Sequence, residues 1–370
     1  MKEKLISIIK NRTFQIATFV LILIFSITTI LVIGIKKFSD EKTIEPSGSE
    51  LVKDEVLDEE GNCVSDIAPV FTSNFIDLSQ VEKLGMVGSI NAGSPTRSYI
   101  QVKEESGMVK VYAPADATLE YVIYSIRSGD LSDAAEYGVD LRVSCEVSYH
   151  FDHLDDVSER IKEYAPSEPT PSTARMDMIS IKIEEGEYLG SSDGTMANTF
   201  DFFVFNKGKK AFHINPERWT WDQNLYGDCP YDYFTDELRD LYYPYLAGPD
   251  GVHPDIPSCG SITHDVEGIL AGGWFQGNAT DLEGSRMIVG DNNSFVELFI
   301  DRDDEPRFGV RDYSFTKVPS EILPGEDICY DDGTKYVYLF LVSKGNLKTN
   351  TGDGDCPDIW TEEGFEEWER

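Results

Sequence analysis

The chain has 370 residues, and 41% of them are hydrophobic, which is enough to bury the core of one large domain or two ordinary ones. Acidic residues outnumber basic ones by 67 to 32, so the formal net charge is −35. The apolar content is too high for a disordered acidic tail. The excess of negative charge disfavours binding to nucleic acid or to anionic lipid surfaces.

The first predicted element is an uncharged apolar segment, Phe14–Ile35. It is long enough to cross a bilayer as a helix, which takes about 20 apolar residues. It exceeds the hydrophobic region of a signal peptide and lacks a small-x-small cleavage pattern before Lys36, so a transmembrane signal anchor is favoured over a cleaved signal.

The position of this segment predicts the topology of the chain. Residues 1–13 form a short cytoplasmic tail, 14–35 the transmembrane helix, and 36–67 an acidic tether. Because a long acidic region follows a short N-terminal tail, we expect a single-pass protein of the cell membrane with its C-terminal domain extracytoplasmic.

Residues 68–215 are predicted to form an antiparallel β domain of the sandwich or open-barrel kind. The strongest strand signal is EYGVDLRVSCEVSYHF, where apolar residues recur at every second position and predict a single strand with one buried face. These residues are Tyr137, Val139, Leu141, Val143, Cys145, Val147 and Tyr149. A helix over Leu154–Tyr164 and a proline-rich loop interrupt the run of strands.

The rest of the chain divides into two further predicted regions. Residues 216–257 form an aromatic-rich helical insert with one helix over about Thr235–Tyr242, and such a cluster typically forms the core of a small subdomain. Residues 258–370 return to strand patterns and predict a second β-rich unit with an acidic tail, which ends in a short helix over EEGFEEWE. The fold class is therefore mainly β.

The six cysteines contain no CxxC pair, so neither a zinc knuckle nor a thioredoxin-like motif is indicated. An even number is compatible with up to three disulfides, whose pairing the sequence leaves open. Cys145 lies on the apolar face of its predicted strand, which favours a buried free thiol.

His150 and His153 are the candidate catalytic residues, because they lie at a predicted strand end beside Asp152, Asp155 and Asp156. On a helix, this spacing would place both imidazoles on one face. In a strand it sends them to opposite faces, which disfavours a chelating pair. The isolated histidines, His213, His253 and His264, are expected to make ordinary hydrogen bonds.

Three acidic clusters make calcium a candidate ligand, although none fits the EF-hand loop pattern. We interpret them first as turn residues. The first cluster contains Asp301, Asp303 and Asp304, the second Asp331 and Asp332, and the third Asp353 and Asp355.

Residues 85–206 resemble the lysostaphin-type (LytM-like) zinc endopeptidases, which cut peptide cross-links in bacterial cell walls. The resemblance is carried, in order, by VYAPADATLEYV, by EYGVDLRVSCEVSYHFDHLDDVS and by GEYLGSSDGTMANTFDFFVFN. It implies a β scaffold with a zinc ion held by a His and an Asp of an H-x-x-x-D motif and by the second His of an HLHFE stretch.

The three zinc-binding positions of that family are not retained. The region of the early histidine contains Ser98 and no nearby aspartate, and the HLHFE stretch falls on Thr199–Phe203, which has no imidazole. Only His153 matches a family histidine, the one in the YaHL segment, which assists rather than binds metal. No zinc cofactor is therefore expected, and peptidase activity is not supported.

These observations lead to three functional hypotheses. The first is a membrane-anchored, extracytoplasmic, catalytically degenerate domain that binds a cell-envelope polymer or a protein partner. The second is an active hydrolase that uses His150, His153 and nearby carboxylates as acid–base or metal groups. The third is a purely structural module of an acidic cell surface.

Overall fold

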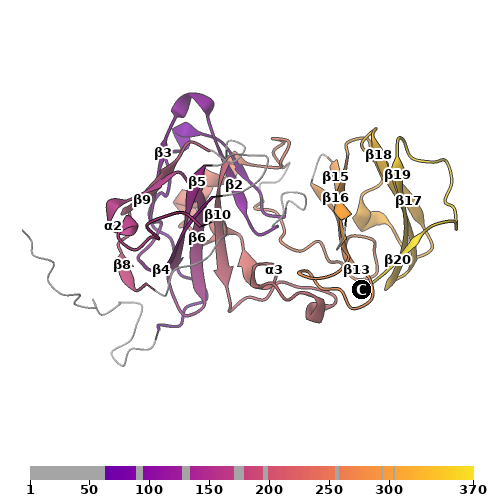
Figure 1. The fold of residues 1–370 in the computed structure, drawn as a ribbon, viewed down its shortest axis with the longest axis horizontal. Coiled ribbons are helices and arrows are strands. Elements are labelled where there is room, and N and C mark those ends of the chain that lie inside the picture. Colours follow the sequence, from indigo (N-terminus) through magenta and orange to yellow (C-terminus); the bar gives the residue numbers. More distant parts are fainter. Residues whose placement is uncertain are drawn as a thin grey trace, which may run out of the picture. The chain divides into compact units, whose positions relative to one another are not determined.

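The computed structural model describes residues 63–88, 95–126, 134–170, 179–194, 199–254, 258–292, 295–302 and 305–370. These residues form a mainly β fold, as the apolar alternation predicts (Figure 1). Among them, no helix has the length and apolar character that a membrane crossing requires. The span predicted over Phe14–Ile35 and most of the acidic tether lie outside the described residues.

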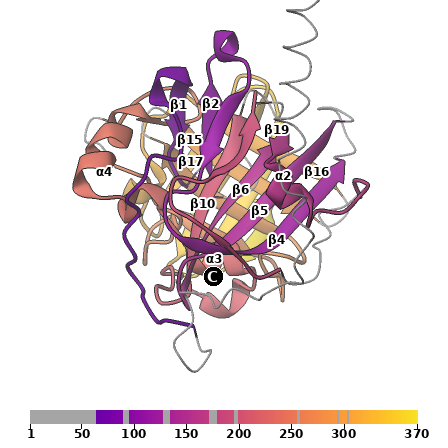
Figure 2. The same ribbon diagram turned by 90° about the vertical axis from the view of Figure 1, so that its left-hand side faces the viewer.

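The first β-unit is built on a large sheet, to which the described residues contribute nine strands. They are Val81–Gly85 (β1), Ser98–Val102 (β2), Ala117–Ile126 (β4), Ala135–Arg142 (β5), Val147–Leu154 (β6), Ile181–Ile183 (β8), Thr199–Asn206 (β10), Gly227–Asp228 (β11) and Leu246–Ala247 (β12). The order is β12-β1-β2-β10-β6-β5-β4-β8, with β11 on β10, and only the β1–β12 pair is parallel in these residues. Figure 2 shows β2, β10, β6, β5 and β4 side by side.

The segment that the alternation predicts to be one strand is a hairpin of β5 and β6. The chain reverses at 143–146, where the Val147 N–H donates to Ser144 Oγ at 3.0 Å. The apolar residues on both sides of the turn still point into one core; they include Val139, Leu141, Tyr149 and Phe151. The pattern thus predicts the buried face correctly and misses the turn.

A smaller sheet covers the same core. Its strands, Val109–Tyr112 (β3), Asp156–Val157 (β7) and Tyr188–Ser192 (β9), pair in the order β3-β9-β7. Val111 and Leu189 of this sheet pack with Phe151 and Phe202 of the large sheet. One face of the large sheet therefore packs against the core, and the opposite face carries polar side chains.

The helix predicted over Leu154–Tyr164 is much shorter in the structure. Leu154 ends β6, and only Glu159–Lys162 (α2) is α-helical. The Ser158 hydroxyl accepts a hydrogen bond from the Ile161 N–H, so the helix begins at this cap and not earlier.

The aromatic segment contains two short α-helices, Asp222–Tyr226 (α3) and Asp236–Tyr242 (α4), and 3₁₀ turns at Pro216–Arg218, Pro230–Tyr233 and Tyr243–Tyr245. The second α-helix confirms the prediction over Thr235–Tyr242, and the Thr235 hydroxyl caps it by accepting from the Leu238 N–H.

The aromatic side chains of this segment do not form a separate core. Phe234 and Tyr242 pack against Phe71 and Phe75 in the core of the first β-unit. Trp219 instead contacts Phe275 in a third, smaller cluster. The aromatic residues thus join elements that are distant in the sequence.

The second β-unit is a sheet to which the described residues contribute eight strands. They are Gly272–Phe275 (β13), Arg286–Asn292 (β14), Phe295–Arg302 (β15), Glu305–Asp312 (β16), Asp327–Asp331 (β17), Lys335–Ser343 (β18), Asn346–Asp353 (β19) and Glu366–Glu369 (β20). Their order is β16-β15-β14-β13-β20-β19-β18-β17, and the end strands β16 and β17 approach each other, so the sheet curls into a nearly closed barrel.

The short helix predicted over EEGFEEWE is wrong, because Glu366–Glu369 is strand β20. Trp368 is only 2% exposed, and its Nε1–H donates to Thr349 Oγ1 at 2.9 Å. Burial of this indole in the barrel outweighs the helix preference of the surrounding glutamates.

All six cysteines are paired, as Cys63–Cys145, Cys229–Cys259 and Cys329–Cys356. The prediction of a free thiol at Cys145 is therefore wrong. Cys145 lies in the turn between β5 and β6 rather than inside a strand, so its side chain is free to bond Cys63.

Candidate functional site

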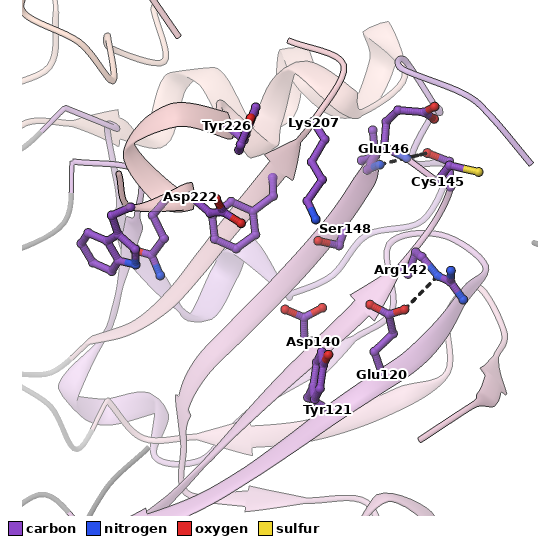
Figure 3. A pocket seen from close by; sticks show the side chains of 15 residues that line it. Glu120, Tyr121, Asp140, Arg142, Cys145, Glu146, Ser148, Lys207, Asp222 and Tyr226 are labelled. Atoms are coloured by element: carbon purple, nitrogen blue, oxygen red, sulfur yellow. Dashed lines mark hydrogen bonds and ion pairs between the residues drawn. The ribbon is translucent and has the colours of Figure 1, made fainter. Parts of the chain in front are cut away.

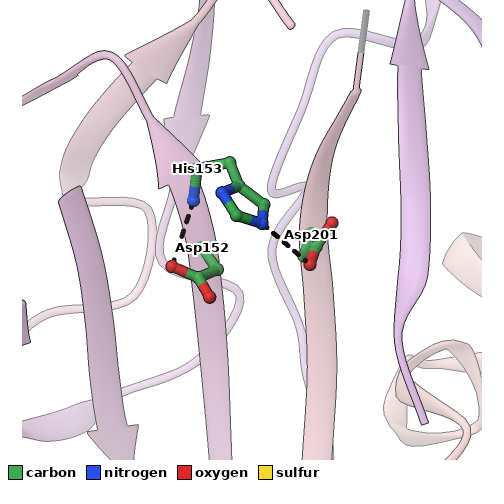
Figure 4. Close-up of side chains that lie close together, drawn as sticks. All are labelled: Asp152, His153 and Asp201. Atoms are coloured by element: carbon green, nitrogen blue, oxygen red, sulfur yellow. Dashed lines mark hydrogen bonds and ion pairs between the residues drawn. The ribbon is translucent and has the colours of Figure 1, made fainter. Parts of the chain in front are cut away.

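A cluster of charged side chains lies on the face of the large sheet that does not contact the core. Strand alternation places Asp201 of β10 beside Asp152 of β6, and His150 of β6 beside Asp140 of β5. Figure 4 shows Asp152, His153 and Asp201 converging from two neighbouring strands. We call Asp140, His150, Asp152, His153 and Asp201, together with Arg97 and Glu136, the polar cluster.

Asp201 is the centre of the polar cluster, and its side chain is only 1% exposed. Arg97 Nη1 donates to Asp201 Oδ2 at 2.5 Å and to Asp152 Oδ2 at 3.0 Å. His153 Nε2 lies 3.4 Å from the same oxygen of Asp201, and its Nδ1 lies 2.8 Å from Glu136 Oε2. Arg97 and His153 thus contact the buried carboxylates of Asp201 and Glu136 and the partly buried carboxylate of Asp152.

Aromatic stacking extends this cluster along the sheet. The centroid of the Phe203 ring lies 4.5 Å from that of the His150 ring and 4.9 Å from the Arg97 guanidinium carbon. His150 Nδ1 lies 3.4 Å from Asp140 Oδ2, which connects the stack to β5. The cation–π contact and the ion pairs together fix the position of Arg97.

The backbone at His153 explains why both imidazoles reach this face. Strict alternation would send His153 to the face opposite Asp152, as the sequence predicts. Its φ is 62°, however, and it is the single described non-glycine residue with a positive φ. The left-handed conformation breaks the alternation at the end of β6 and directs the imidazole to Asp201. The prediction that His150 and His153 point to opposite faces is therefore wrong.

Gly138 of β5 leaves room for the cluster. A Cβ at this position would lie 2.8 Å from Asp152 Oδ1 and 3.4 Å from His150 Nε2. The first of these separations is shorter than real Cβ contacts allow, so any larger residue would displace the Asp152 carboxylate. The absence of a side chain at Gly138 thus allows the Asp152 carboxylate to lie beside Arg97.

The electrostatics of the cluster favour charged forms. Burial alone would lower the pKa of His153, but hydrogen bonds to Asp201 and Glu136 outweigh it and raise the pKa to about 9. Burial opposes ionisation of Asp152, yet His150, His153 and Arg97 hold its pKa well below the usual range. The pKa of Arg97 is raised by Asp201 and Asp152, against the effect of its own burial. At neutral pH, His153 is therefore an imidazolium.

These groups do not fit a zinc site as they are arranged. Asp152, His153 and Asp201 offer ligand atoms that lie within 4.8 Å of one another. Zinc needs a deprotonated imidazole and carboxylate oxygens at about 2.0–2.2 Å from the metal. In the observed arrangement the Arg97 guanidinium contacts one oxygen of each carboxylate, Asp152 Oδ2 and Asp201 Oδ2, so zinc would have to displace the guanidinium from these two oxygens and a proton from His153. Arg97 and the imidazolium thus supply the positive charge that an ion would bring.

One atom of the cluster remains unsatisfied. Asp201 Oδ1 is buried and has no hydrogen-bond partner among the residues that the structure describes. A buried carboxylate oxygen without a partner is costly, so this atom marks where an additional donor or a water molecule would be stabilising.

A pocket of about 340 Å³ lies farther along the same face, between the sheet and α3. Figure 3 shows Asp140 and Lys207 pointing into this space, with Tyr226 of α3 on its far wall. Asp140 belongs both to the pocket lining and to the ion pair with His150, so the pocket and the polar cluster form one continuous polar surface.

The candidate catalytic residues predicted from sequence, His150 and His153, are brought together by the structure on this surface. Sequence reasoning missed Arg97, Glu136 and Asp140 as their partners. The sequence did contain one signal for such partners: Asp201 is a charged residue between Phe200 and Phe202 in an otherwise apolar strand. A charge in such a strand is rarely buried without a partner of opposite charge.

The remaining histidines have the ordinary roles that we expected. His213 Nε2 contacts the Asn224 carbonyl at 2.9 Å, His253 Nδ1 the Leu246 carbonyl at 2.9 Å, and His264 Nε2 the Gly88 carbonyl at 2.8 Å. Each imidazole thus binds backbone oxygen at a position away from the polar cluster.

Three of the acidic groups considered for calcium, Asp301, Asp331 and Asp332, make contacts within the protein, and Asp353 and Asp355 are exposed. Asp332 accepts from the backbone N–H groups of Thr334 and Lys335, and Asp331 from that of Gly333, so both are turn residues. Asp301 pairs with Arg286 at 3.3 Å. Asp303 and Asp304 lie outside the described residues.

No protein-family model matches the sequence, and comparisons with curated proteins and with solved structures found no significant match either.

Proposed function

We propose that this chain is a membrane-anchored, extracytoplasmic binding protein whose first β-unit is a catalytically degenerate, metallopeptidase-like domain that holds a cell-envelope polymer. The observation that carries the proposal is the contact of Arg97 with both Asp152 and Asp201. A guanidinium stays charged at any ordinary pH, and here it occupies one oxygen of each carboxylate, so it competes with a metal ion for these groups.

The geometry supports the resemblance to the lysostaphin-type enzymes. Asp201 stands where that family has the second histidine of its HLH motif, and His153 stands where it has the assisting histidine. These two side chains lie 3.4 Å apart in the structure. An ion-pair network at the positions that the resemblance assigns to the family's histidines supports binding rather than hydrolysis.

The disulfides support an extracytoplasmic location. Three pairs use all six cysteines, and structural disulfides persist in oxidising compartments outside the cytosol. The apolar segment Phe14–Ile35 provides the proposed anchor, and the acidic tether would hold the β-units away from the membrane.

The test is co-sedimentation of the purified full-length chain with insoluble bacterial cell-wall polymer, with and without EDTA. We expect the chain to sediment with the polymer to the same extent in both conditions and to release no soluble peptide. Hydrolysis of the polymer that EDTA abolishes would overturn the proposal. So would failure to sediment with the polymer, and capture by a protein partner alone would replace it.

A second candidate function, a hydrolase that uses His153, is favoured by one observation. Its protonated imidazole lies between Glu136 and Asp201, an arrangement in which it can donate a proton as a general acid. If hydrolysis is detected, His153→Gln should abolish it, whereas His253→Gln, which changes a histidine outside the polar cluster, should leave it unchanged.

A further inference from the structure

The pocket beside α3 has partly exposed aromatic rings on its walls. Tyr121 of β4 and Trp221 and Tyr226 at the two ends of α3 all line it, and each is half-buried. Flat rings of this kind offer an apolar surface to a ligand while the rest of the side chain stays anchored. Its volume of about 340 Å³ is in the range of small-molecule sites.

The backbone of Trp221 is anchored where α3 begins. Its backbone N–H donates to the Asp281 carboxylate, which also accepts from the Thr220 N–H and from Asn224 Nδ2. Asp281 is fully buried. A backbone that is already fixed at Trp221 loses less conformational entropy when a ligand binds, which favours tighter binding.

The pocket lining contains both hydrogen-bond acceptors and hydrogen-bond donors. The carboxylates of Glu120, Asp140 and Asp222 accept hydrogen bonds, and Arg142, Lys207 and Ser148 donate them. Arg142 Nε and Glu120 Oε1 form an ion pair at 3.0 Å on this lining. Such a set suits a ligand with many hydroxyl groups, each of which both donates and accepts.

From these observations we infer that the pocket binds a pyranose ring of a neutral polysaccharide. The inference rests on the proposed function and names the chemical class of the polymer. The C–H face of the sugar would lie against the Trp221 and Tyr226 rings, and its hydroxyls would reach the carboxylates and Lys207.

Other ligand classes fit the pocket less well. Four carboxylates line it, since Glu146 adds to the three above, against only two cationic side chains, so a phosphate or an anionic polymer would be repelled. A wholly apolar ligand would leave the same charged groups unpaired on burial, which is costly.

The test is isothermal titration calorimetry of the purified full-length chain with two probes, cellotetraose and N-acetylated chitotetraose. We expect at least one of them to bind. Trp221→Ala should weaken binding about tenfold or more, which corresponds to losing roughly 1.4 kcal/mol of contact energy. Trp221→Tyr, which keeps a flat ring, should retain most of the affinity.

The matched control is Trp360→Ala, which removes a tryptophan from the second β-unit and should bind as the unchanged chain does. Circular dichroism verifies that each variant is folded. If the chain sediments with cell-wall polymer but binds neither oligosaccharide, or if Trp221→Ala binds them like the unchanged chain, the pocket assignment is overturned and the proposed function stands. If sedimentation also fails, both are overturned.

Discussion

Substitution of Arg97 by methionine tests the energetic role of the polar cluster. The guanidinium contacts two carboxylates whose side chains are 1% and 13% exposed, at 2.5 and 3.0 Å. Its removal would leave Asp201 and Asp152 buried near each other with His153 as the remaining close cation. Breaking a buried ion pair by deleting one partner costs about 3–5 kcal/mol, so the free energy of unfolding should fall by that amount.

The measurement is urea-induced unfolding followed by far-ultraviolet circular dichroism at pH 6. The matched control is Arg160→Met, because Arg160 pairs with Glu187 at 2.8 Å but its side chain is 48% exposed. An exposed pair contributes about 0–1 kcal/mol. The double variant Arg97→Met/Asp201→Asn should recover part of the loss, because it removes the buried charge that lacks a partner. If Arg97→Met costs no more than Arg160→Met, the cluster is not the tightly coupled network described above.

Three further predictions concern stability. Because the pKa of His153 rises from 6.5 to about 9 on folding, protonation of His153 contributes about 3 kcal/mol to the free energy of unfolding below pH 6.5, and this contribution is lost as the pH rises to 9. The variant His153→Gln should therefore remove this decrease in stability between pH 6.5 and 9. A curve of stability against pH that is the same in the variant would refute the prediction. Gly138→Ala should destabilise the fold by about 1–3 kcal/mol through its clash with the Asp152 carboxylate, whereas Gly345→Ala, which meets open space, should be neutral in the same urea titration. Cys63→Ser/Cys145→Ser should lower the free energy of unfolding by about 4 kcal/mol, since this disulfide closes a loop with a sequence separation of 82; a loss below about 1 kcal/mol would contradict the pairing.

The β-strands were predictable wherever local signals agree with burial. Apolar alternation predicts the core-facing residues of β5 and β6, and Thr235 predicts the start of α4. The turn at 143–146 was missed because Ser144 is its one turn-favouring residue, and Val143 and Cys145 continue the apolar alternation through it. Strand β20 was missed because burial of Trp368 depends on a neighbouring strand and not on its own sequence.

The candidate site was predictable only in part. Its histidines were visible as chemistry-bearing residues at a strand end, but their partners were not. Arg97 lies 55 positions from Asp152 and 104 from Asp201, so only the pairing of β2, β10 and β6 brings them together. The left-handed backbone at His153 has no local signal either, because the tertiary contacts of its imidazole stabilise it.

The most direct test of the central claim, that charged side chains close the site against metal, is an NMR titration of the His153 imidazole in the full-length chain. We expect an imidazolium at pH 7.5 that titrates near pH 9 and whose resonances do not shift on addition of one equivalent of Zn²⁺. A neutral imidazole at pH 7.5, whose resonances shift on addition of that equivalent, would contradict it.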